Sequence, residues 1–195
     1  MSDASHEPVG VIAVADPKIL FLTQWWPADL SENPVVVDTA RALRRIGPVL
    51  VVSGPPLNLR TNEITDGHSW VRHQVGKLGP FPFTRHSAFP GHSASPLHRM
   101  AMYTTFAASS VRSVPSVWSQ ADVCVVYASP MTAATAGYLG QKLRDVPYIC
   151  IVQDVWPDSV VASGLLRSEM IVRLAHSSLT WMTNGYYRGA SKIVV

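Results

Sequence analysis

Short, uninterrupted apolar runs recur along the chain and are separated by longer segments with helical periodicity. Runs of this kind, without polar alternation, are typical of strands that are buried on both faces. A strand followed by a helix and then by another such strand predicts a βαβ unit, and hence a parallel sheet. The strands predicted in this way are Lys18–Thr23, Val49–Ser53, Trp70–Val75, Asp122–Ala128, Pro147–Val152 and Ser191–Val195.

Proline, glycine and small polar residues mark the boundaries of the helices between these runs. Asn33-Pro34 is typical of an N-cap followed by proline at the first helical position, and Ser95-Pro96 and Ser129-Pro130 repeat the pattern. The helices that begin there are expected to end at Gly47, before Pro115 and near Leu143. We expect a short helix after Asp154 that ends at Gly164, and a longer helix from about Ser168 to Tyr187. Residues 76–94 are expected to form a loop. The alternation predicts a Rossmann-like, doubly wound α/β domain with a mainly parallel sheet of about six strands.

The composition fits one globular domain. Of the 195 residues, 47% are hydrophobic and 15% are charged, which suits a sizeable core and excludes a disordered chain. Residues 1–17 are expected to be a flexible leader before a domain over 18–195, because Val9–Ala15 is too short and wrongly flanked for a signal peptide. The net charge of +3 does not indicate a nucleic-acid partner. Cys124 and Cys150 lie in apolar runs and are predicted to be buried thiols, as fits a reducing cytosol.

Ligands of doubly wound sheets bind beyond the carboxyl ends of the strands, so the residues that follow each predicted strand are the candidates for a site. After the first strand come Trp25 and Trp26, whose rings could stack on a sugar or a lipid; the alternative is that one of them completes the core. After the fourth strand, Tyr127 precedes a Ser129-Pro130 helix start. The N–H groups exposed at such a start suit an anion, and the alternative is a plain helix cap.

The fifth predicted strand is followed by the densest group of polar and aromatic residues in the chain. It contains two carboxylates, an amide, an indole and a hydroxyl within seven residues: Gln153, Asp154, Trp156, Asp158 and Ser159. Asp154 comes directly after an apolar strand and is the strongest candidate for a functional carboxylate. For Asp158 and Ser159 the alternative is that either one caps the next helix.

Residues 67–121 contain no Asp or Glu and interleave basic with aromatic side chains. Arg85 and Arg99, together with Tyr103 and Phe106, are therefore predicted to contact an anionic membrane surface or a phosphate-bearing acceptor. The alternative is an ordinary surface loop followed by a partly buried helix.

The sequence predicts neither a metal ion nor a cofactor. His86, His92 and His98 lack the i, i+4 spacing of a helical metal site and have no carboxylate or cysteine nearby. Residues 24–33 contain no glycine, so the G-x-G-x-x-G fingerprint of NAD and FAD domains is absent after the first strand.

Several of these segments together resemble a known family, the retaining glycosyltransferases of family 4, and within it the fucosamine-transferase-like enzymes of surface-polysaccharide assembly. The resemblance covers about Lys18 to Val195, and Gln153–Ser159 is its most specific part. The segments that carry it are Ile19–Pro27, Ser53–Pro56, His92–Leu97, Val126–Ala134, Val152–Val160 and Ala162–Gly164.

The resemblance implies a GT-B fold, in which two Rossmann-like domains face each other across a cleft. The N-terminal domain of the family receives the acceptor, often a sugar on a polyprenyl diphosphate, and the C-terminal domain binds the nucleotide-sugar donor, which is a substrate and not a cofactor. This chain resembles the N-terminal domain alone, so we expect it to lack transferase activity without a donor-binding domain. We also expect a cytoplasmic protein, peripheral on the inner face of the cell membrane.

Within this resemblance, Asp154 and Ser129 are expected to position the acceptor hydroxyl, and Trp25, Trp26 and Trp156 to line the sugar. The other residues expected to bind the acceptor are Tyr127, Gln153, Asp158 and Ser159. The loop over Leu30–Val35 has no glycine, where family members commonly have one that approaches the donor phosphates. Two other functions stay open. One is a non-catalytic acceptor-binding or docking module that works with a separate donor-binding subunit, and the other is an unrelated nucleotide-binding α/β enzyme, which the missing glycine-rich loop disfavours.

Overall fold

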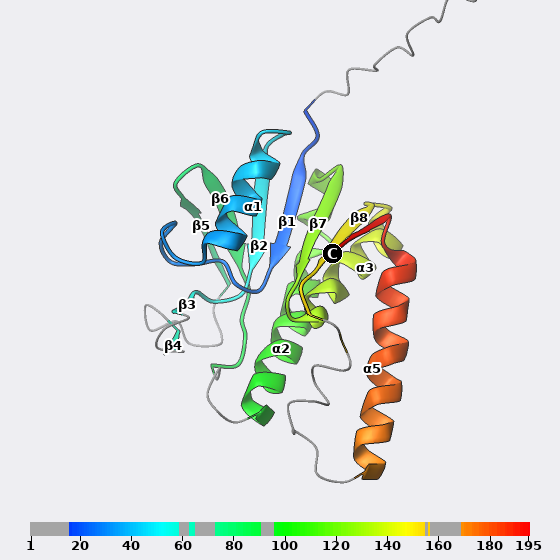
Figure 1. Ribbon diagram of the computed structural model, residues 1–195. Helices are drawn as coiled ribbons and strands as arrows, with labels where there is room; N and C mark the ends of the chain where they lie inside the picture. Colours follow the sequence, from blue (N-terminus) through cyan, green and yellow to red (C-terminus); the bar gives the residue numbers. More distant parts are fainter. Residues whose placement is uncertain (1–15, 59–62, 65–72, 91–95, 155, 157–168) are drawn as a thin grey trace, which may run out of the picture.

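The computed structural model describes residues 16–58, 63–64, 73–90, 96–154, 156 and 169–195. Six longer strands and four α-helices form most of the described fold, with short strands and 3-10 turns between them (Figure 1). In chain order the elements are β1 Ile19–Thr23, α1 Pro34–Arg44, β2 Val49–Ser53, β3 Leu57–Asn58, β4 Glu63–Ile64, β5 Gln74–Leu78, β6 Phe81–Arg85, α2 Pro96–Ser110, η2 Val111–Ser113, η3 Trp118–Gln120, β7 Val123–Ala128, η4 Met131–Ala133, α3 Ala134–Arg144, β8 Tyr148–Val152, α5 Glu169–Gly189 and β9 Lys192–Val194.

The main sheet has the order β5-β6-β2-β1-β7-β8-β9. All neighbouring strands pair in parallel except β5, which pairs antiparallel with β6. This confirms the predicted Rossmann-like α/β fold with a mainly parallel sheet. The strand order reverses between β1 and β7, and such a reversal is the switch point at which doubly wound sheets bind their ligands.

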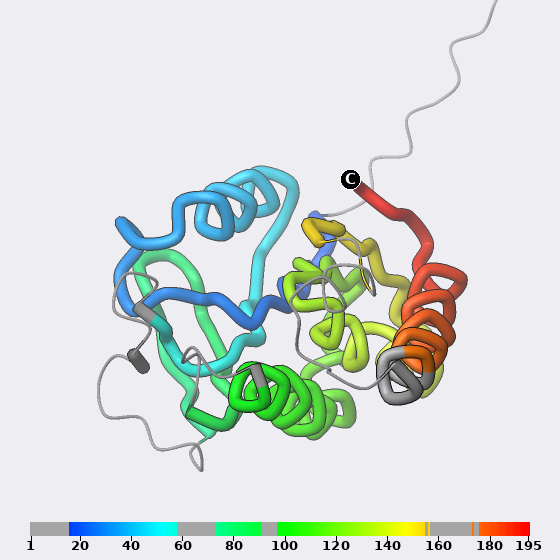
Figure 2. Tube along the Cα trace, turned by 60° about the horizontal axis from the view of Figure 1, so that its bottom comes forward, coloured from blue at the N-terminus to red at the C-terminus, as the bar shows by residue number. Residues whose placement is uncertain are grey.

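Helices cover both faces of the sheet, as the fully buried β1 requires. On one face, Val36, Val37 and Ala40 of α1 pack against the side chains of β1 and β2. On the other face, α2, α3 and α5 enclose a second core that contains Phe106 and Tyr186. Figure 2 shows α1 on one side of the central strands and α2 on the other, and Figure 1 shows α2 and α5 extending beyond the carboxyl ends of the strands.

The third strand and the loop after it differ from the prediction. Residues 70–72 of the predicted strand lie outside the described residues, and 76–94 are not all loop, because β5 and β6 form a hairpin there. The turn is Gly79-Pro80, with Gly79 at φ +55°. Buried and exposed residues alternate over Phe81, Pro82 and Phe83, so that Pro82 faces outward and both rings enter the core. Pro82 also precedes the residues that pair with β2, Phe83 to Arg85, so its missing N–H does not interrupt that pairing.

Two of the predicted helix caps are also wrong in detail. Asn33 is in the left-handed region at φ 45° and makes no capping bond; its Nδ2 donates instead to the Trp25 carbonyl at 3.0 Å. The Ser129–Pro130 peptide is cis and precedes η4, and α3 begins only at Ala134. In both places the polar side chain connects neighbouring loops rather than capping its own helix.

Several other predictions meet the structure directly. Cys124 and Cys150 are free, buried thiols, as predicted, and burial raises the pKa of Cys150 to about 11. The long helix α5 begins at Glu169, one residue after the predicted start at Ser168. Most of the leader and the short helix expected to end at Gly164 lie outside the described residues. In the part of the chain that the structure describes, no helix is both long and apolar enough to span a bilayer.

Candidate functional site

A hydroxyl and a carboxylate meet at the carboxyl edge of the sheet, beside the switch point. Ser129 follows β7 and Asp154 follows β8, two neighbouring parallel strands whose last residues, Ala128 and Val152, are paired. The Ser129 Oγ donates a hydrogen bond to Asp154 Oδ2 at 2.8 Å, and both side chains can be reached by solvent. The two residues predicted to act on an acceptor hydroxyl are therefore in direct contact.

Three aromatic rings from three separate segments lie in a chain near this edge. Trp25 follows β1, Tyr103 belongs to α2, and Trp156 follows β8. The Trp25 and Tyr103 ring centroids are 6.3 Å apart in an edge-to-face arrangement, and those of Tyr103 and Trp156 are 6.5 Å apart. We call these three residues the aromatic chain. Aromatic rings of this kind offer the flat, polarisable surfaces on which the C–H faces of sugars pack.

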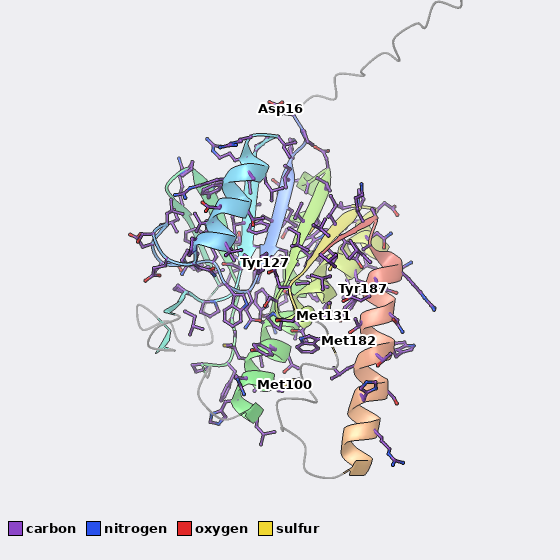
Figure 3. All side chains as sticks on the ribbon, in the orientation of Figure 1. Asp16, Met100, Tyr127, Met131, Met182 and Tyr187 are labelled. Carbon is purple, nitrogen blue, oxygen red and sulfur yellow. The ribbon has the colours of Figure 1, made fainter. Side chains whose placement is uncertain are left out.

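The Asp154 carboxylate acts electrostatically on two tyrosines of the site. Burial raises the pKa of the Tyr103 phenol, the Arg99 guanidinium works against this increase, and Asp154 adds to it. Burial and then Asp154 also raise the pKa of Tyr127. Both phenols therefore keep their protons at neutral pH and can donate hydrogen bonds. Figure 3 shows Tyr127 at the lower end of β7, with Met131 just beyond it.

The other predicted site residues differ in how far their side chains are exposed to solvent. Gln153 is exposed next to Asp154, and Arg99 is half-buried one helical turn before Tyr103 on α2. Trp156 is 7% exposed and is therefore the buried member of the aromatic chain. Asp158 and Ser159 lie outside the described residues.

Three predicted contact residues are instead part of the interior. Trp26 is fully buried and packs edge-to-face against Phe81, with 5.4 Å between the ring centroids, so it belongs to the core and cannot line an acceptor. Phe106 is likewise fully buried, on the side of α2 that faces the sheet. Arg85 is 5% exposed; its Nη2 donates to the Pro27 carbonyl at 2.6 Å. Neither Phe106 nor Arg85 can contact a membrane surface, because the fold has already buried them.

Two further polar residues lie at the same edge and were not among the predicted site residues. Gln24 follows β1 and His86 follows β6, and both side chains are almost fully buried. Each is a polar residue directly after a strand, which is the signal that singled out Asp154. The signal alone does not separate these two residues from other polar residues that end a strand, because their burial depends on the packing of α2. The described residues hold no group of three or more His, Cys, Asp or Glu side chains suited to a metal ion.

The edge thus combines a solvent-accessible carboxylate, a hydroxyl, two protonated phenols and a set of aromatic faces. Such a surface suits a neutral ligand rich in hydroxyl groups, since a carboxylate accepts hydrogen bonds from hydroxyls and the rings pack on their carbon skeleton. Neither a scan against protein-family models nor a search of curated proteins found a match to this chain.

Proposed function

We propose that this chain is the acceptor-binding part of a retaining glycosyltransferase that moves a sugar from a nucleoside-diphosphate sugar to a lipid-linked sugar acceptor. The observation that carries the proposal is the Ser129–Asp154 hydrogen bond at the carboxyl edge of the sheet, beside the switch point. The aromatic chain beside it supports a sugar as the ligand. The resemblance to family 4 enzymes, which rests most specifically on Gln153–Ser159, agrees with the same function.

In the proposed reaction the acceptor hydroxyl displaces Ser129 from Asp154. The Asp154 carboxylate then accepts the hydrogen bond of this hydroxyl and fixes the direction of its oxygen toward the donor. Ser129 keeps a donor and an acceptor for a second hydroxyl of the same sugar. The donor sugar and its leaving diphosphate are held by a donor-binding domain, which on the resemblance faces this edge.

A lipid-linked acceptor would bring the carboxyl edge to a membrane surface, on the cytoplasmic side. Two arginines of the acid-free stretch 67–121 are accessible: Arg99 on α2 is half-buried, and Arg112 on η2 is exposed. These two residues, and not the buried Arg85, are the candidates for contact with anionic lipid or with the acceptor diphosphate.

The direct test is sugar binding by the unmodified chain and by an Asp154→Asn variant. The probes are the methyl glycosides of glucose, galactose, N-acetylglucosamine and N-acetylgalactosamine, followed by saturation-transfer and titration NMR. Losing the negative charge weakens a charge-assisted hydrogen bond worth about 1.5–3 kcal/mol, so the Kd of the best probe should rise about 10- to 100-fold.

Asp145→Asn is the matched control. Asp154 follows β8, whereas Asp145 is exposed and precedes the start of β8. The Asp145 backbone is left-handed, at φ 55°, a conformation that asparagine adopts readily. This variant should bind the probes like the unmodified chain. Absence of binding by every glycoside, or equal binding by the Asp154→Asn variant, would contradict the proposal.

A further inference from the structure

A buried amide side chain lies where the carboxyl end of β1 meets α2. Alternate residues of β1, Leu20 and Leu22, point into the core beneath α2, and Gln24 is the next residue on that face. The Gln24 side chain is 2% exposed, and neither its Nε2 nor its Oε1 has a hydrogen-bond partner among the described residues. The apolar face of β1 therefore ends on an amide that the fold leaves unpaired.

Gln24 belongs to a row of three residues across neighbouring strands. Gln24, Gly54 and His86 each follow the last residue of β1, β2 and β6, which pair in register at that end. A Cβ at Gly54 would lie 3.4 Å from both Gln24 Cγ and Phe106 Cδ2. The Gln24 side chain and the Phe106 ring therefore flank Gly54. We call Gln24, Gly54 and His86 the Gln24–Gly54–His86 row.

His86 presents a second unpaired group in this row. Its ring is hydrogen-bonded to the Ser109 backbone on α2, and its Nε2 is buried without a partner in the described part of the chain. The bond to Ser109 is therefore made by the other ring nitrogen, Nδ1. Burial, and then the charges of His73 and Arg112, lower the pKa of His86 from 6.5 to about 4, so the ring is neutral at neutral pH. A neutral ring that donates from Nδ1 has a lone pair on Nε2 and is an acceptor there.

The row holds three of the nine buried side-chain polar atoms that have no hydrogen-bond partner among the described residues. Nearly all buried polar groups in folded proteins have a partner, and each one without a partner lowers stability. A bound group that pairs with the three atoms of the row would remove this cost. A hydroxyl matches them, because it donates to the His86 lone pair while it accepts from the Gln24 amide. A deprotonated phosphate oxygen does not, because it has no proton to give to His86 Nε2.

We propose that the Gln24–Gly54–His86 row is an inner subsite of the acceptor site, where a hydroxyl of the acceptor sugar donates to His86 Nε2 and accepts from Gln24 Nε2. This inference rests on the proposed function. Gln24 adjoins Trp25 in the chain, so the row continues from the Trp25 end of the aromatic chain.

The first measurement compares the unmodified chain with Gln24→Met, which keeps the length of the side chain and removes both unpaired atoms. In the same glycoside titrations, Gln24→Met should raise the Kd of the best probe by about tenfold or more, because a site built for a hydroxyl binds poorly once its partner is lost. Its urea midpoint should be equal to or higher than that of the unmodified chain. Gln120→Met is the control, since Gln120 is exposed and its Nε2 donates to the Ser116 carbonyl, and it should leave binding unchanged.

The second measurement does not depend on any variant. The ¹⁵N resonance of His86 Nε2 should move when the glycoside is added, because a lone pair that accepts a hydrogen bond changes its shielding. An unmoved resonance, or unchanged affinity of Gln24→Met, would overturn the inference and would indicate a water molecule held by the fold. If Asp154→Asn weakens binding while both of these results are negative, the subsite fails and the proposed function stands. If no glycoside binds the unmodified chain, both fail.

Discussion

The hydroxyl of Ser129 has two possible roles in this structure, and the fold selects between them. A serine before a proline commonly caps a helix, yet here it donates to Asp154 on the neighbouring strand. Because the pair is exposed, its hydrogen bond exchanges readily with solvent and contributes little to stability. A ligand hydroxyl can therefore take the place of Ser129 at small free-energy cost, which makes the pair a suitable resting state for a binding site.

His86 makes the stability of the protein depend on pH in a defined direction. Its pKa is about 4 in the folded chain and near 6.5 when unfolded, so between these values the unfolded chain binds a proton that the folded chain does not. The contribution of His86 is complete above about pH 6.5 and is lost as the pH falls toward 4, by up to about 3 kcal/mol. Urea midpoints at pH 7.5 and 4.5 measure this loss.

A His86→Gln variant removes the titrating ring and should lose clearly less stability between the two pH values. His176→Gln, on the exposed face of α5, should behave like the unmodified chain. Equal losses in the unmodified chain and His86→Gln would mean that His86 is protonated without penalty in the fold.

At the scale of elements, the strands were predicted more reliably than the turns. The predicted strand Val49–Ser53 is found with the same bounds, and β7 and β8 differ from prediction by one residue at their starts. Their apolar runs are buried from both sides, which leaves little choice of structure. The β5–β6 hairpin was missed because proline and glycine in it suggested a loop. Its strand character comes from pairing with β2, a contact between distant segments that local sequence does not reveal.

Helix α3 lies close to its neighbours because of its glycines. A Cβ at Gly140 would lie 1.8 Å from Trp118 Nε1, and the Trp118 side chain is fully buried. Gly140→Ala should therefore destabilise the protein by about 1–3 kcal/mol, since the indole has to move within a packed core. Thermal and urea unfolding measure the change.

Gly185→Ala is the matched control for this prediction. It lies within α5, and a Cβ there meets nothing within 4 Å. Alanine is favoured over glycine inside a helix by up to about 1 kcal/mol, so this variant should be slightly more stable. If both variants change stability in the same direction, helix propensity and not the contact with Trp118 decides the outcome.

At the scale of the whole molecule, the candidate site is built from segments that are far apart in the chain. The sequence identified Asp154, Ser129 and Trp25 because each follows an apolar strand. The sequence could not exclude Trp26 or Arg85 from the site, because their burial depends on the tertiary fold. Trp26 packs against Phe81 of the β5–β6 hairpin, and Arg85 donates to the Pro27 carbonyl. The positions of the tyrosines around Asp154 likewise follow from the packing of α2 on the sheet.

The loop after β1 predicts that this chain binds nucleotide sugars weakly. It has no glycine to admit a diphosphate, the Trp25 N–H donates to Thr23 Oγ1, and α1 begins with Pro34, which has no N–H. Calorimetric titration with uridine and guanosine diphosphate sugars should give a Kd above about 100 µM. A Kd near 1 µM, or about −8 kcal/mol, would assign the donor site to this domain instead.

The proposed lipid-linked acceptor predicts salt-sensitive binding to anionic vesicles through the carboxyl edge. Each basic residue near such a surface contributes about 1 kcal/mol, so an Arg99→Glu, Arg112→Glu double variant should lose at least about tenfold in vesicle affinity at low salt. Binding of the unmodified chain should weaken as salt rises, because exposed charges are screened. Co-sedimentation with phosphatidylserine-containing vesicles measures both effects.

The control reverses the same number of charges elsewhere. Arg44 and Arg45 lie at the C-terminal end of α1, where with Arg41 they line a hollow of about 410 Å³ beside the β5–β6 turn. An Arg44→Glu, Arg45→Glu variant should bind vesicles nearly as well as the unmodified chain. Greater loss in this control than in the Arg99, Arg112 variant would assign membrane contact to α1.

The pairing of β1 with β7 also has a consequence for how the protein is made. Lys18 and Asp122, at the starts of these two strands, are 104 positions apart. At about 5–20 residues per second, the ribosome delivers β7 about 5–20 s after β1. During that interval β1 can pair with β2 while its other edge, an apolar run, has no partner and is open to association with other chains. The protein should therefore depend on chaperones that shield nascent chains, and its yield should fall when they are depleted.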